Sequence, residues 1–296
     1  MDKTVIGIGE ILWDVLPGGK RLGGAPANFA WHTAQMGHDG IAVSAVGDDA
    51  LGMEIKDTLD ARGLHNVLQV NDHPTGTVEV QVDASGIPAY DIKEDVAWDY
   101  LRFTPDLEAL AARADAVCFG SLAQRSGVTR DTIRRFIAAM PKDRDVLRIC
   151  DINLRQEFYT PDMIAESIRL CNIIKLNEDE LQTMRTIFPS IAGGEDDQCC
   201  RKLLDSFGLR AVILTRGEDG SAVYHSGGKS ALPTPKVDVA DTVGAGDSFT
   251  AAFVSALLQG ATVGEAHRLA VDVSAFVCPC HGAMPVLPDD LKRRLG

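Results

Sequence analysis

The stretch Asp241-Thr242-Val243-Gly244-Ala245-Gly246-Asp247-Ser248-Phe249-Thr250-Ala251-Ala252-Phe253 joins a glycine-rich turn directly to an apolar segment of helical character. Gly244 and Gly246 allow the backbone to approach a ligand closely. The first turn of the helix adds N–H groups without helical partners and the positive end of the helix dipole. Together these groups predict a binding site for an anion such as phosphate.

Asp247 stands beside this predicted anion site, where a phosphate would repel its carboxylate. The position suits a base that accepts the proton of an attacking hydroxyl, and an ordinary Asp pKa near about 4 is sufficient for that role. A helix N-cap is the alternative, because Asp is a common capping residue. The segment alone does not separate these two interpretations.

The composition limits the partners of the chain. Its 296 residues carry a formal net charge of -13, which repels phosphate backbones and anionic lipid headgroups. We therefore expect no nucleic acid and no membrane as partner. An anionic substrate such as ATP would need local donors or a bound cation. The chain begins with an apolar strand instead of a basic leader and contains no apolar run of about 18 residues, so we expect a cytoplasmic protein.

Short β-branched apolar runs alternate with segments of helical periodicity along most of the chain. This alternation predicts a mostly parallel sheet with helices on both faces. The predicted strands cover residues 4–9, 41–46, 114–119, 145–150, 172–176 and 211–215.

Residues 75–94 break this pattern. Polar and apolar side chains alternate strictly from Thr77 to Val82, and Ser85-Gly86 provides a turn into a second run at residues 89–92. This predicts an antiparallel hairpin. The hairpin either covers a site as a small lid or extends the main sheet, and the pattern fits both arrangements equally well.

The pattern Asp-Thr-x-Gly-Ala-Gly-Asp-x-Phe at residues 241–249 resembles the C-terminal signature of ribokinase-like (PfkB-type) carbohydrate kinases, and every position of that signature is present. In the family the last Asp is the catalytic base and the preceding residues form the anion hole. The resemblance implies these roles for Asp247 and for Gly244, Ala245 and Gly246.

Residues 23–30, Gly-Gly-Ala-Pro-Ala-Asn-Phe-Ala, resemble the family's N-terminal motif for holding sugar hydroxyls. Gly24 permits close backbone approach, and Asn28 offers a polyol both a donor and an acceptor. By itself this segment reads as an ordinary loop-to-helix junction. Asp14 lies after the first predicted strand, and in the family an Asp in this stretch contacts the sugar.

Two further residues complete the sugar side of the predicted site. Arg155 ends the segment Asp151-Ile152-Asn153-Leu154-Arg155, which follows a strand at the edge where open α/β sheets bind ligands. We expect Arg155 to contact the sugar or its phosphate. Trp98, within Val96-Ala97-Trp98-Asp99, belongs to the predicted lid and resembles a sugar-contacting lid residue of bacterial fructokinases.

The nucleotide side follows from the same resemblance. Residues 177–180 match the family's Asn-x-x-Glu motif, which implies ATP binding by Asn177 and organisation of Mg²⁺ through water by Glu180. Thr215, Arg216 and Gly217 resemble the nucleotide-side loop. A surface turn is the alternative for this loop, and an exposed acidic helix start is the alternative for residues 177–180.

The C-terminal region implies two more contacts. Residues 277–285, with Gly282, resemble the loop beside the adenine, which in many relatives also helps to bind a monovalent cation. Asp241 and Val243 occupy the other two positions of that cation site. K⁺ is therefore a candidate cofactor in addition to ATP and Mg²⁺.

Taken over the chain, the resemblance implies one ribokinase-like kinase domain spanning residues 1–296. Its fold is a three-layer α/β/α sandwich with a mostly parallel central sheet and a small β-sheet lid from about residues 11–22 and 73–102. The implied reaction transfers the γ-phosphate of ATP to a primary hydroxyl of a monosaccharide, with fructose first and ribose, 2-keto-3-deoxygluconate or a nucleoside as alternatives. A non-catalytic sugar or nucleotide sensor and a homodimer formed through the lid stay open.

Overall fold

The computed structural model describes residues 2–16, 18–82, 88–237 and 243–294. Most of the strands in these ranges belong to one nine-stranded sheet. Its strands are β1 (Thr4–Ile8), β4 (Asp39–Gly47), β5 (His65–Asn71), β8 (Ala116–Gly120), β9 (Leu147–Asp151), β10 (Ile173–Asn177), β11 (Ala211–Thr215), β12 (Ser221–His225) and β13 (Gly228–Leu232).

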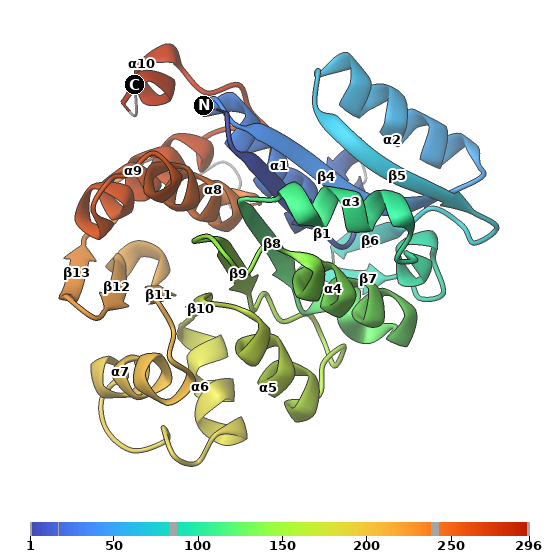
Figure 1. Ribbon diagram of the computed structural model, residues 1–296. Helices are drawn as coiled ribbons and strands as arrows, with labels where there is room; N and C mark the ends of the chain where they lie inside the picture. Colours follow the sequence, from blue (N-terminus) through green and yellow to red (C-terminus); the bar gives the residue numbers. More distant parts are fainter. Residues whose placement is uncertain (1, 17, 83–87, 238–242, 295–296) are drawn as a thin grey trace.

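The strand order of this sheet is β13-β12-β11-β10-β9-β8-β1-β4-β5. Neighbouring strands are parallel from β11 to β5, whereas β12 and β13 are antiparallel additions at one edge, which can be followed in Figure 1. The six predicted strands correspond to β1, β4, β8, β9, β10 and β11, so the mostly parallel sheet is confirmed. The three remaining strands were not predicted, because they lie toward the edges and lack continuous apolar runs.

Helices cover both faces of the sheet, which makes three layers. One face carries α1 (Ala25–Gln35), α2 (Ala50–Ala61), α8 (Ala245–Leu258), α9 (Val263–Val277) and the short α10 (Asp289–Arg293). The other carries α3 (Pro105–Arg113), α4 (Gly127–Ala139), α5 (Pro161–Leu170), α6 (Glu178–Ile187) and α7 (Asp196–Phe207). None of the helices in the described ranges is long and apolar enough to span a membrane.

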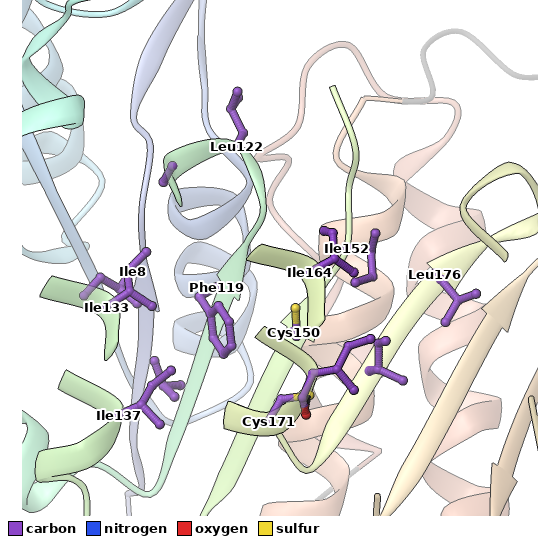
Figure 2. Close-up of a cluster of buried hydrophobic side chains, with 14 of the residues drawn as sticks. Ile8, Phe119, Leu122, Ile133, Ile137, Cys150, Ile152, Ile164, Cys171 and Leu176 are labelled. Atoms are coloured by element: carbon purple, nitrogen blue, oxygen red, sulfur yellow. Dashed lines mark hydrogen bonds between the residues drawn. The ribbon is translucent and has the colours of Figure 1, made fainter. Parts of the chain in front are cut away.

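The central strands are buried on both faces because successive side chains point to opposite layers. In β9, Ile149 packs in the layer of α8 and α9. The next residue, Cys150, packs in the opposite layer with Ile164 of α5 and with Cys171, as Figure 2 shows. This double burial explains why these strands appear in the sequence as continuous apolar runs.

A second, four-stranded sheet has the order β3-β2-β6-β7. It contains β2 (Leu12–Leu16), β3 (Gly19–Gly23), β6 (Thr77–Val82) and β7 (Pro88–Ile92). The predicted hairpin therefore forms a separate sheet with β2 and β3, and the alternative in which it extends the main sheet is excluded. Its predicted turn at Ser85-Gly86 lies outside the described residues, and its role as a moving lid stays a prediction.

The parallel strands end at a common edge, and this edge positions the functional residues. Glu10 follows β1, Asp151 ends β9, Asn177 ends β10 and Thr215 ends β11. Helices α1 and α8 pack against each other.

Candidate active site

The first turn of α8 has the geometry that an anion-binding turn requires. Gly244 precedes the helix with φ 80°, and no side chain caps the helix start. A Cβ at Gly244 would also lie 2.5 Å from the Cβ of Ala283, so this position needs glycine for both its conformation and its packing. The N–H groups of Ala245, Gly246 and Asp247 have no acceptor within the helix, because they belong to its first turn.

Asp247 and Asn28 are 219 positions apart in sequence but form a direct contact. Asn28, in the first turn of α1, donates a hydrogen bond from Nδ2 to Oδ2 of Asp247 at 2.7 Å. Asp247 is the third residue of α8, not its N-cap, and its carboxylate is directed to another helix. The capping interpretation of Asp247 is therefore wrong, and the carboxylate is available for chemistry.

The pKa of Asp247 differs from the ordinary value expected from the sequence. Burial and the charge of Asp151 raise it to about 6, against opposing contributions from the Asn28 hydrogen bond, Lys175 and Arg155. Asp247 is thus a stronger base than an ordinary Asp and is still ionised at neutral pH. Both properties favour a role as general base.

A buried ion pair lies directly against the turn of α8. Lys175 of β10 donates from Nζ to both carboxylate oxygens of Asp151, at 2.8 and 3.1 Å. Thr250 donates from Oγ1 to Asp151 Oδ2 at 3.3 Å and to the backbone oxygen of Gly246 at 2.9 Å. A Cβ at Gly246 would lie only 3.0 Å from the Lys175 Nζ. A positive charge is therefore fixed beside the turn.

The sequence analysis missed Lys175, although a signal was present. Lys175 interrupts an otherwise apolar run, Ile173-Ile174-Lys175-Leu176, near the carboxyl end of a central strand. Burial alone lowers the pKa of Lys175, but the charge of Asp151 and its hydrogen bonds, together with Glu180 and Asp247, outweigh burial and raise it. The ammonium group therefore keeps its charge.

Glu180 fixes the backbone of two segments at this edge. Its carboxylate accepts hydrogen bonds from the N–H of Leu154 at 2.9 Å and of Asn177 at 2.8 Å. The side chain of Asn177 in turn accepts from the N–H of Glu180, which completes a capping box at the start of α6. Burial raises the pKa of Glu180. Its contact with water around Mg²⁺ stays a prediction.

The predicted sugar residues of the N-terminal region lie beside one another. Asp14 on β2 is partly exposed, and its carboxylate packs against the backbone of Gly23. Gly24 has φ 113° and approaches Glu10 so closely that a Cβ would lie 2.5 Å from the Glu10 backbone oxygen. Together with Asn28, these residues surround the start of α1.

Trp98, which was predicted to contact the sugar, lies in the hydrophobic core. None of its side chain is exposed, and the guanidinium of Arg125 stacks 4.0 Å from its ring centroid. Arg125 is held by two hydrogen bonds to Asp99, each 2.9 Å long. A direct contact between Trp98 and a sugar would require this segment to move.

Arg155 is exposed on the loop after β9, and its charge acts on Asp247 and on Glu10. Thr215 pairs with Asn177 across β10 and β11, so the two predicted nucleotide segments are adjacent. Arg216 lies 3.8 Å from Glu178 and 3.9 Å from Asp196. Gly217 follows it with φ 51°.

The loop that contains Gly282 is anchored by helices α1 and α2. His32 contacts the Ala283 oxygen at 2.9 Å, Trp31 donates to the Pro285 oxygen at 3.0 Å, and Arg62 donates to the Met284 oxygen at 2.9 Å. Burial lowers the pKa of His32 to about 4, so the ring is neutral at physiological pH. The loop therefore forms a fixed support for Gly244.

The predicted cation site is described only in part. Val243 is exposed at the start of the turn, whereas Asp241 lies outside the described residues. The structure thus places Val243 next to Gly244 and gives no geometry for the second cation residue. K⁺ binding stays a prediction.

Glu10 is a further residue of the site that the sequence analysis missed. It is 3% exposed. Burial is the main cause that raises its pKa to about 7, and Asp247 raises it further. In the sequence Glu10 is the first residue after an apolar strand, where an exposed loop carboxylate is the ordinary interpretation.

Comparison with known proteins identifies the family of the chain. The model of the pfkB family of carbohydrate kinases matches residues 15–290. The chain belongs to this family. The ATP-dependent 6-phosphofructokinase of Thermoanaerobacterium thermosaccharolyticum is 31% identical over 91% of this chain and 83% of that protein. The fructokinase of Klebsiella pneumoniae is 29% identical over 100% of both chains.

Solved structures confirm the fold of this kinase family member. The crystal structure of fructokinase from Vibrio cholerae with fructose, ADP and calcium ion has a TM-score of 0.81, with 22% identity over 100% of this chain and 99% of that chain. The predicted ribokinase-like α/β fold with a separate small sheet is therefore confirmed, as is the PfkB resemblance.

Proposed function

We propose that this chain transfers the γ-phosphate of Mg-ATP to a primary hydroxyl of a monosaccharide, with fructose as the first candidate. The contact between Asp247 and Asn28 carries this proposal. It joins a carboxylate of raised basicity to an amide that can hold a sugar hydroxyl, at the edge where open α/β sheets bind ligands.

Asp247 would act as the base. Its ionised carboxylate accepts the proton of the acceptor hydroxyl as the oxygen attacks phosphorus. Asn28 keeps Oδ2 of Asp247 in place through its 2.7 Å hydrogen bond. The other carboxylate oxygen, Oδ1, can then face the acceptor. Most of the catalysis on this account is positioning.

The turn of α8 would stabilise the charge that spreads over the phosphoryl oxygens. The N–H groups of Ala245, Gly246 and Asp247 supply fixed donors at a helix start. Lys175 adds a positive charge beside Gly246 and is held there by Asp151. This local charge offsets the acidic net charge of the chain, which otherwise repels ATP.

The residues present fit a magnesium ion that is held mainly by phosphates and water. The carboxylates of Asp151 and Glu180 interact electrostatically and would face the phosphates, and such oxygens suit Mg²⁺. Among the described residues, no group of three or more His, Cys, Asp or Glu could enclose a metal by itself. Mg²⁺ would neutralise phosphate charge when bound, while Glu180 and Asp151 would accept hydrogen bonds from its water.

Fructose is supported by one relative in particular. The Klebsiella pneumoniae fructokinase aligns with this chain over the full length of both proteins. Other relatives of comparable identity are a ribokinase, a 6-phosphofructokinase and a nucleoside kinase, so the acceptor must be tested across these classes. ATP as donor is supported by the ATP-dependent 6-phosphofructokinase.

A coupled ADP-release assay tests the proposal. Mg-ATP, with and without K⁺, is offered with fructose, ribose, 2-keto-3-deoxygluconate, fructose 6-phosphate, glucose and adenosine. Strong turnover with fructose is expected, and stronger turnover with another acceptor would correct only the substrate. Absence of turnover with all acceptors would contradict the kinase proposal and favour a sensor.

A further inference from the structure

Glu10 carries a buried carboxylate oxygen that has no hydrogen-bond partner among the described residues. The residue is 3% exposed, and its Oε2 atom makes no hydrogen bond with any described residue. Buried polar atoms in native proteins are nearly always paired, because an unpaired one loses its bonds to water without compensation. An unpaired acceptor beside a candidate active site indicates a missing donor.

The surroundings of Glu10 place this oxygen in the acceptor half of the site. The carboxyl group receives hydrogen bonds from its own N–H and from the N–H of Ala25, the first residue of α1. Its charge interacts with Asp247 and with Arg155. Glu10 therefore lies beside the start of α1, within electrostatic range of the candidate base and of the exposed arginine on the loop after β9.

A second unpaired acceptor lies in the first turn of α1, the helix that begins beside Glu10. Asn28 donates from Nδ2 to Asp247, but its Oδ1 atom is buried and also lacks a partner among the described residues. Ala25 and Asn28 are three residues apart on α1, so they share one face of the helix. Two buried acceptors near one base match a ligand that presents more than one hydroxyl donor.

We propose that Glu10 is a specificity residue that binds a second hydroxyl of the phosphoryl acceptor, in addition to the hydroxyl that Asp247 activates. The inference rests on the proposed kinase function and deepens it. It assigns the acceptor to polyols with at least two hydroxyl groups and disfavours simple alcohols. A site built to bond a hydroxyl discriminates strongly against analogues that lack it, because its own polar atom then stays unpaired.

The protonation of Glu10 supports this role. Burial raises its pKa to about 7, while the hydrogen bonds of its own N–H and of Ala25 and the charge of Arg155 oppose this rise. Near neutral pH the group therefore exists in both forms, and either form can bond a hydroxyl, as acceptor or as donor. Partial protonation also limits the repulsion between Glu10, Asp247 and an incoming phosphate.

A purely structural role is the alternative, since one oxygen of Glu10 bonds the N–H of Ala25 and could simply cap α1. Glu10→Gln keeps the size of the side chain and one acceptor oxygen, whereas Glu10→Ala removes both. Glu108→Gln is the matched control, because it makes the same chemical change at an exposed position of α3. Thermal unfolding establishes that each variant is folded.

The decisive experiment measures kcat and KM for the best acceptor and its single-deoxy analogues with wild-type protein and each variant. We expect KM for the acceptor to rise about tenfold or more in Glu10→Ala, since a hydrogen bond to a buried group is lost, and by a smaller factor of more than about twofold in Glu10→Gln, which keeps one acceptor oxygen. The kcat value and the KM for ATP should change less than about threefold. In the wild type, each deoxy analogue should have a higher KM than the parent acceptor. In Glu10→Ala this difference should disappear for one analogue only, the one that lacks the hydroxyl bound by Glu10.

Two results would overturn the inference while the kinase function stands. One is a KM for the acceptor within about twofold of wild type in both variants. The other is a KM ratio between each deoxy analogue and the parent acceptor that is the same in wild type and in Glu10→Ala. That result would assign Glu10 to capping alone. If Glu10→Ala does not fold, Glu10→Gln decides. A wild-type protein that neither turns over nor binds any polyol in calorimetry would remove both the kinase proposal and this one.

Discussion

Helices α8 and α9 follow one another in the chain, and each has an acidic residue at its third position. Glu265 of α9 accepts hydrogen bonds from the N–H and Oγ1 of Thr262, at 2.8 and 2.7 Å, and these bonds lower its pKa. Asp247 of α8 accepts from Asn28 on another helix, and burial raises its pKa to about 6. The same residue class at the same helix position is structural in one case and available for chemistry in the other.

The residue before each helix explains the difference. Thr262 caps α9 and completes a capping box with Glu265, so the donors of that helix start are used internally. Gly244 has no side chain, and no side chain caps α8. Helix α1 begins in the same way with Gly24, whereas α6 begins with the capping box of Asn177. The two described helices that follow a glycine N-cap, α1 and α8, are those that meet at the candidate site.

The largest expected difference is between variants of Asp247 and Glu265, the acidic residues at the third position of α8 and α9. In Asp247→Asn we expect turnover to fall at least about a hundredfold with acceptor and ATP binding largely intact, since the base is lost and its shape is kept. Glu265→Gln should leave turnover unchanged. Steady-state kinetics with calorimetric binding measures both. Near-normal turnover in Asp247→Asn would remove Asp247 from the role of base.

Replacing Gly244, the glycine before α8, should lower turnover as well as stability. Gly244→Ala places a Cβ against Ala283 at a left-handed position, which displaces the anion-binding donors, and we expect turnover to fall about tenfold or more. Gly260→Ala is the control, because Gly260 has φ 88° but open space around its Cβ position. Both variants should lose about 1 kcal/mol or more in denaturant unfolding. Equal activity in the two would contradict an anion hole at Gly244.

The Asn28 hydrogen bond should be visible in the pH dependence. Asp247 must be ionised to act, so kcat/KM should fall as the pH drops below about 6 in the wild type. The bond from Asn28 lowers the pKa of Asp247, and Asn28→Ala should therefore move this acid limb to higher pH. Asn66→Ala removes a surface amide bond to Asp60 and should leave the limb in place. A limb that does not move would exclude coupling between Asn28 and Asp247.

The smallest effect is expected at the start of α9. Thr262→Ala removes the cap of that helix, and we expect it to lower the free energy of unfolding by about 1 kcal/mol without changing kcat or KM. Urea unfolding and the ADP-release assay measure the two quantities. A clear loss of activity in Thr262→Ala would show that the two helix starts are not as separate as the structure indicates.

The sheet and its strands could be predicted because burial on both faces leaves continuous apolar runs in the sequence. The edge strands β5 and β13 were not predicted, since partial exposure permits polar residues that interrupt such runs. Strand β12 is buried, but its apolar run covers only Ala222 to Tyr224. From the residue pattern alone, the small sheet could be predicted only as a hairpin, because its pairing with β2 joins segments about sixty residues apart. The family resemblance supplied its second part, at about residues 11–22. No local pattern shows which sheet such a hairpin enters.

The candidate site could be predicted where glycine and acid form a dense local motif, as in residues 244–247. The burial of Glu10 could not be predicted, because it depends on contacts with distant segments, whereas Lys175 could have been found as a charged residue within an apolar strand. Trp98 is a different case, since the family resemblance implied a contact with the sugar, whereas the structure surrounds the ring with core residues and Arg125. The raised pKa of Asp247 likewise depends on Asp151, which is far from it in sequence.

Identification of the product tests the central claim most directly. Wild-type protein, Asp247→Asn and Glu265→Gln are each incubated with Mg-ATP and the acceptor panel, and ADP and sugar monophosphate are quantified by chromatography and mass spectrometry. We predict equal amounts of ADP and sugar monophosphate for wild type and Glu265→Gln, and at least about a hundredfold less of both products in the same time for Asp247→Asn. ADP without a phosphorylated acceptor, or equal product from Asp247→Asn, would contradict phosphoryl transfer by way of Asp247.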